Sequence, residues 1–83
     1  MYDEHLDRAL AEEFAGHGEA IHRLKLRDSS FRSLMELNHA IWSEIQQIQN
    51  GLQAASEAYL TGLEKHRLKV LDEIARRLAA SMA

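Results

Sequence analysis

Between residues 31 and 52 the apolar positions recur in alternating steps of three and four, which is the period of one helix face. These positions are Phe31, Leu34, Asn38, Ile41, Ile45, Ile48 and Leu52, of which only Asn38 is polar. Asp28 or Ser29 is suited to cap this helix, because a short side-chain oxygen accepts an unpaired backbone N–H. Gly51 is suited to follow its last turn. The pattern predicts a long helix over residues 29–50.

A second helical stripe occupies the C-terminal third of the chain. Its apolar positions are Leu60, Leu63, Val70, Leu71, Ile74 and Leu78. Ser56 is a suitable N-cap, so we predict a helix over residues 56–81. Only about five residues connect the two helices, and so short a link makes neighbouring helices antiparallel. The sequence therefore predicts a helical hairpin.

The first third of the chain is less regular. Leu6, Leu10 and Phe14 recur every four residues, which predicts a helix over about residues 3–15. Gly16 and Gly18 interrupt this pattern, and another one or two helical turns follow before the hairpin. We expect one or two short helices here, so the predicted fold class is all-α.

Composition agrees with a small helical protein. The chain has 83 residues, no proline, no cysteine and a formal net charge of -3. The absence of cysteine excludes disulfides and zinc–thiolate sites. No apolar run approaches the ~20 residues that span a bilayer, and the acidic start MYDEHLD is unlike a secretory signal. We expect a cytoplasmic protein with no membrane contact and no cofactor.

Two stretches of the chain share the pattern of a known family. The first reads EEF…H.E.IH.LK..D..F..L and is carried by Glu12, Glu13, Phe14, His17, Glu19, Ile21, His22, Leu24, Lys25, Asp28, Phe31 and Leu34. The second reads L..H.L.VLDEI…L and includes Leu63, Arg67, Leu68, Lys69, Asp72, Glu73, Ile74 and Leu78. At these positions the chain resembles the YdcH-like family of small bacterial proteins, a domain of unknown function.

The resemblance implies an antiparallel helical hairpin with a leading helix and no assigned enzymatic activity. It implies one domain over residues 12–83, preceded by an extension over residues 1–11 that we expect to be helical. Three departures stand out. Ala15 and Gly16 replace the family's proline and acidic residue, Asn38 replaces a histidine or tyrosine, and charged positions become Trp42 and Leu71.

Large apolar side chains beside the helix seam favour self-association. Met35 and Trp42 flank the seam and would be largely exposed in an isolated hairpin. Asn38 sets the register by meeting a polar partner, which is either Arg67 of the same hairpin or a second Asn38. We therefore predict a homo-oligomer, most simply a dimeric four-helix bundle, with Met35, Asn38, Trp42 and Leu71 at or near its interface. The predicted function is non-enzymatic protein–protein interaction, with a further protein partner that the sequence does not name.

Basic side chains suggest an alternative function. Arg23, Arg27, Arg32, Arg76 and Arg77 lie in segments that the hairpin brings towards one end. Such an end could bind nucleic acid or an acidic partner. The simpler interpretation is that these arginines pair with neighbouring acids or are solvated, and the scarcity of interleaved aromatic residues favours it.

Histidines raise a lesser alternative. His17 and His22 are five residues apart, whereas two ligands on one helix face need a spacing of three or four. Glu13 and His17 make at best half a site, and His66 or a second chain would have to complete it. No serine lies in a recognisable nucleophile pattern. We therefore predict no metal site and no catalytic residues.

Overall fold

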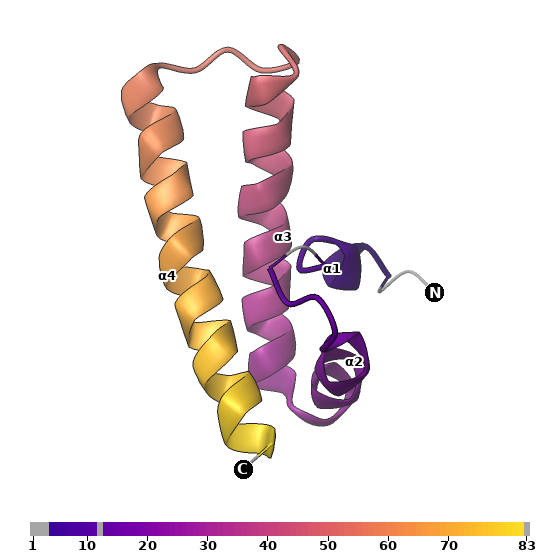
Figure 1. The fold of residues 1–83 in the computed structure, drawn as a ribbon. Coiled ribbons are helices and arrows are strands. Elements are labelled where there is room, and N and C mark those ends of the chain that lie inside the picture. Colours follow the sequence, from indigo (N-terminus) through magenta and orange to yellow (C-terminus); the bar gives the residue numbers. More distant parts are fainter. Residues whose placement is uncertain (1–3, 12, 83) are drawn as a thin grey trace.

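The computed structural model describes residues 4–11 and 13–82, and these form four helices and no strand (Figure 1). Helix α1 spans Glu4–Arg8, α2 spans Gly18–Arg27, α3 spans Ser29–Gln49 and α4 spans Glu57–Met82. The two long helices lie side by side and run in opposite directions, while α1 and α2 lie against α3. The all-α prediction is confirmed. None of the helices, over the described residues, has an apolar stretch that could cross a membrane.

Local side-chain chemistry sets the ends of the long helices. Asp28 caps α3, because its Oδ1 accepts hydrogen bonds from the backbone N–H groups of Ser30 at 3.0 Å and Phe31 at 3.2 Å. Ser56 Oγ accepts from the backbone N–H of Tyr59 at 3.1 Å and caps α4. Gly51 follows α3 with a φ of +78°, a left-handed conformation that glycine adopts without strain. Both long helices begin and end within one residue of the predicted bounds.

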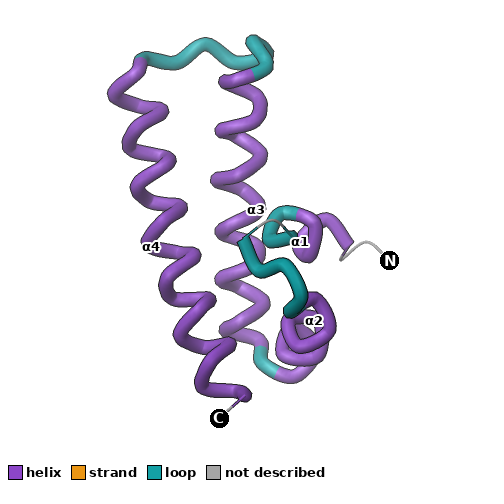
Figure 2. The backbone as a smooth tube through the Cα atoms, viewed as in Figure 1, coloured by secondary structure: helices purple, strands orange, loops and turns teal. Residues whose placement is uncertain are grey.

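The N-terminal segment departs from its predicted form. The helix expected over residues 3–15 ends at Arg8, and a series of turns follows (Figure 2). The backbone N–H groups of Leu10 and Ala11 bond to carbonyls three residues back. The Ala9 carbonyl accepts hydrogen bonds from the side chains of Arg67 and Asn38. The predicted start at residue 3, and Glu12 of the family-like pattern, lie outside the described residues.

The core sits where this segment covers the hairpin. Its members include Leu6, Leu10, Phe31, Met35 and Ile74, each at most 1% exposed. The expectation that Met35 would be largely exposed is therefore wrong. It assumed an isolated hairpin, whereas α1 and the following turns add a third layer over α3.

Candidate functional site

A polar cluster around Arg67 joins three parts of the chain. Arg67 donates from Nε to Asn38 Oδ1 at 3.1 Å and from Nη2 to the Ala9 carbonyl at 2.9 Å. Nη2 also reaches Glu13 Oε1 at 3.0 Å. Asn38 is fully buried, and its Nδ2 donates to the same Ala9 carbonyl at 3.5 Å. Of the two partners predicted for Asn38, the structure therefore shows Arg67.

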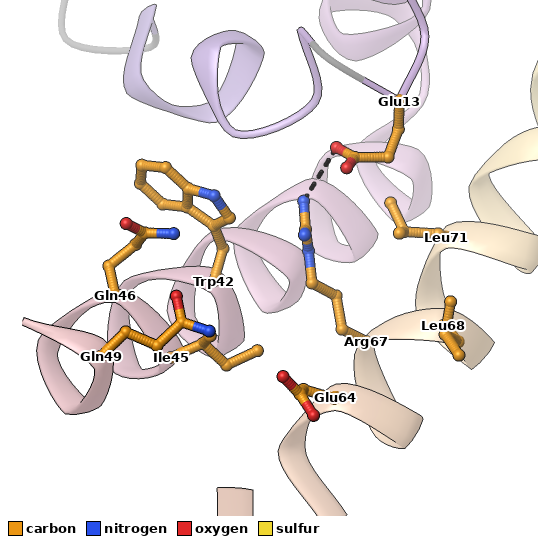
Figure 3. A pocket seen from close by; sticks show the side chains of 9 residues that line it. All are labelled: Glu13, Trp42, Ile45, Gln46, Gln49, Glu64, Arg67, Leu68 and Leu71. Carbon is orange, nitrogen blue, oxygen red and sulfur yellow. Dashed lines mark hydrogen bonds and ion pairs between the residues drawn. The ribbon is translucent and has the colours of Figure 1, made fainter. Parts of the chain in front are cut away.

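Beside this cluster a groove of about 390 Å³ runs between α3 and α4. Its walls are Glu13 from the N-terminal segment, Trp42, Ile45, Gln46 and Gln49 from α3, and Glu64, Arg67, Leu68 and Leu71 from α4. Figure 3 shows Arg67 crossing the groove towards Glu13, with the Trp42 indole on the opposite side. A second cavity of about 370 Å³ shares Glu13, Trp42 and Gln46. Trp42 therefore forms a wall between two hollows.

Helix α4 presents an apolar stripe to solvent at the rim of the groove. Leu68 is 61% exposed and Leu71 is half-buried, and the exposed residues Ala75 and Ala79 continue the same face. The spacing of these four residues is three, four and four, which keeps them on one side of the helix. We call Leu68, Leu71, Ala75 and Ala79 the α4 stripe. This surface can bind apolar side chains, and the groove beside it adds amide and carboxylate groups for hydrogen bonds.

The predicted interface residues separate into two pairs. Trp42 and Leu71 line the groove and remain partly accessible. Met35 and Asn38 are each 0% exposed inside a single chain, so they offer no surface to a second copy of this fold. The interface prediction must be corrected for these two residues, because the N-terminal segment already covers them.

A second ionic contact holds α1 against α2. Lys25 is only 2% exposed, and its Nζ lies 3.0 Å from Asp7 Oδ1. His22 Nδ1 approaches the other oxygen of Asp7 at 3.6 Å. A buried lysine needs such a carboxylate, because an uncompensated charge in the interior is costly. The contact therefore keeps α1 in place.

The histidines of the opening stretch do not converge. His17 lies exposed at the N-terminus of α2 without a side-chain cap, and His22 turns to Asp7. His66 is exposed on α4. Within residues 4–11 and 13–82, no three histidine, aspartate or glutamate side chains group as a metal site would need. The placement gives the metal hypothesis no support.

A different histidine pair lies between α1 and α3. The rings of His5 and His39 make an edge-to-face contact with centroids 4.4 Å apart, and His39 lies 6.1 Å from Trp42. Burial, and then the nearby charge of His5, lower the pKa of His39 below its ordinary value. No pattern in the sequence indicated this pair, because its members are 34 positions apart, the difference between 5 and 39.

Four of the five arginines of the predicted basic patch lie beside carboxylates. Arg23 approaches Glu19 at 3.9 Å and Arg32 approaches Glu36 at 3.3 Å. Arg76 and Arg77 both bind Glu73, and Arg77 also reaches Ser30 at the start of α3. Arg27 is exposed in the last turn of α2. Since the neighbouring acids reduce the local positive potential, the placement favours the simpler interpretation over a nucleic-acid surface.

Another polar cluster fastens the loop end. Glu44 accepts hydrogen bonds from Tyr59 Oη and from Gln53 Nε2, the latter at 2.8 Å. These bonds lower the pKa of the Glu44 carboxyl, and the same contact raises the pKa of the Tyr59 hydroxyl. The cluster ties the loop and the start of α4 to α3, and so it is structural in character.

The fold and the groove together define a small all-α protein with an exposed apolar surface on its longest helix. Comparison of the chain with family models, curated proteins and solved structures gives no match.

Proposed function

We propose that this protein is a non-enzymatic helical module that works through protein–protein interaction, beginning with a second copy of itself. The observation that carries the proposal is the exposed α4 stripe, with Leu68 at 61% exposure beside the apolar walls Trp42 and Leu71. Two hairpins that pack these flanks together form a four-helix bundle, the usual way for such a pair to cover apolar surface. The proposal includes a cytoplasmic location and, from its sequence resemblance, membership of the YdcH-like family.

Several features support binding over chemistry. The groove is walled mainly by apolar side chains and amides, with the carboxylates of Glu13 and Glu64, and its one arginine already bonds within the chain, to Glu13 among others. A guanidinium whose hydrogen bonds are used in this way holds segments of the fold together. An apolar surface with a polar rim is typical of protein interaction sites.

Light scattering of the full-length protein over a range of concentrations tests the proposal. We expect the wild type to form a dimer, and Leu68→Asp to shift it to monomer, because a carboxylate would be desolvated at the interface. Trp42→Asp should act in the same direction. Leu52→Asp is the matched control, since Leu52 is 79% exposed in the loop and away from the groove.

Circular dichroism of each variant distinguishes lost association from lost folding. Leu68→Asp should keep the wild-type helix content, because this side chain is largely exposed in the single chain. A wild type that stays monomeric at every concentration would contradict self-association. A dimer that Leu68→Asp leaves unchanged would contradict the assigned surface.

A further inference from the structure

Two opposite charges lie along the edge of the α4 stripe. Lys65 and Asp72 are both exposed, and they are seven positions apart on α4. Seven residues are close to two full turns, so both side chains leave the helix on nearly the same side, about 10 Å apart along its axis. Among the described residues, neither forms a hydrogen bond or ion pair. The pKa of nearby Arg76 is raised chiefly by its hydrogen bond to Glu73, and the charge of Asp72 adds a little to this rise. The edge therefore carries one positive and one negative group that are available to a partner.

We propose that a second copy binds with its α4 antiparallel to the first, about a two-fold axis through the α4 stripe. This inference rests on the proposed function and specifies its orientation and register. In this antiparallel pair, Leu68 packs against the partner's Leu71. The two-fold axis creates a second, identical contact between Leu71 and the partner's Leu68. Among the described side chains of α4, Leu68 is the most exposed large apolar one, so this contact removes it from water.

The charges select the antiparallel direction. When Leu68 lies opposite the partner's Leu71, Lys65 stands within about 3 Å of axial height of the partner's Asp72, well within reach of a lysine side chain. Symmetry creates the reciprocal pair. A parallel two-fold arrangement would instead place this edge of one helix and the same edge of its partner on opposite sides of the interface, so Lys65 could not reach the partner's Asp72.

The remaining residues of the stripe are compatible with this register. Ala75 comes opposite the partner's Glu64, and a small methyl group allows the helices to approach while the carboxylate at the groove rim keeps contact with water. The edge is complementary to its own copy, because Lys65 of each helix lies beside Asp72 of the other helix when the two-fold axis relates them. That self-complementarity identifies the occupant as a second copy of this chain.

Charge reversal in the full-length protein tests the register. Lys65→Asp places two carboxylates at each predicted pair, and Asp72→Lys places two ammonium groups there. We expect either variant alone to dimerise about tenfold more weakly than the wild type, since two exposed pairs are lost and replaced by repulsion. An equimolar mixture should form heterodimers. In the mixed dimer the carboxylate introduced by Lys65→Asp meets the ammonium introduced by Asp72→Lys, and the unchanged Lys65 of one chain meets the unchanged Asp72 of the other.

Native mass spectrometry of the mixture measures the heterodimer directly. A heterodimer fraction well above the statistical half supports the register. Arg27→Asp is the matched control, because this exposed arginine makes the same charge change but lies in the last turn of α2, outside the α4 stripe, and its dimerisation should be unchanged.

The failures of the two proposals are distinguishable. A wild type that is monomeric at all concentrations overturns self-association and the register together. A wild-type dimer that Leu68→Asp disrupts, but whose charge variants neither weaken alone nor prefer to mix, overturns the register and leaves the proposed function standing.

Discussion

At the end of the hairpin where α3 begins, Phe31 and Met35 are completely buried, whereas Ile48 and Leu60 near the connecting loop are only half-buried and Leu52 is 79% exposed. We call residues 29–45 and 67–82 the covered half, and residues 46–66 the loop half. The same kind of helical spacing runs through both halves. The difference is the N-terminal segment, which packs on the covered half only (Figure 1). Two helices alone leave much of their apolar surface in water, and a third layer is needed to bury it.

The largest expected effect compares one apolar residue from each half. Phe31→Ala removes a fully buried aromatic ring and should lower the free energy of unfolding by about 4 kcal/mol, because the cavity cannot collapse completely. Leu52→Ala in the loop half should change it by less than ~0.5 kcal/mol. Urea unfolding followed by circular dichroism measures both. Similar losses for the two variants would show that the covered half is no better packed than the loop half.

The second effect concerns the polar cluster that attaches the N-terminal segment. Arg67→Met leaves the Ala9 carbonyl and the buried Asn38 amide without their guanidinium, and should cost about 2–3 kcal/mol. Arg76→Met is the control, because the Arg76 side chain is 71% exposed and an exposed ion pair such as that with Glu73 contributes little to stability. Hydrogen exchange of the Leu10 amide should also quicken in the first variant. A loss no larger than that of the control would mean that Arg67 is not what holds the segment.

These two halves also explain what the sequence could and could not predict. The periodicity of α3 and α4 and the caps Asp28 and Ser56 follow from local chemistry, so their bounds were predictable to a residue. The burial of Met35 was not, because it depends on residues about 30 positions earlier. The short N-terminal pattern is compatible with both a helix and a series of turns, and the side chain that binds the Ala9 carbonyl, Arg67, is 58 positions away.

The candidate site shows the same limit. Trp42 and Leu71 were predictable as surface apolar residues, because they depart from a charged pattern in the resembling family. Nothing in the sequence indicated that Leu68 lies at the surface, because the apolar stripe of α4 is broad and its pattern does not reveal which edge α3 covers. The burial of Lys25 against Asp7 left no periodic signal at all.

In the loop half, two glycines should respond in opposite directions. Gly51→Ala forces a side chain into a left-handed conformation and should cost about 1 kcal/mol. Gly62 lies within α4 with open space around it, so Gly62→Ala should stabilise by about 0.5–1 kcal/mol through helix propensity. Thermal melting measures both changes. If both substitutions stabilise the protein, or both destabilise it, the left-handed conformation assigned to Gly51 is wrong.

The smallest effect is a pH dependence in the covered half. Because the pKa of His39 is lowered in the folded protein, the unfolded chain takes up its proton more readily. Stability should therefore be unaffected by His39 above about pH 6.5 and should fall as the pH drops through that value. Urea unfolding at about pH 7.5 and about pH 5.5 measures the loss, which His39→Gln should reduce. An equal loss in that variant would assign the pH dependence to other groups.

The bond between Arg67 and the Ala9 carbonyl has a consequence for how the protein is made. Residue 67 is synthesised 58 residues after residue 9. At about 5–20 residues per second, roughly 3–12 s separate the synthesis of the Ala9 carbonyl from that of the guanidinium that binds it. During translation, Leu6 and Leu10 are therefore made well before the side chain that secures their segment.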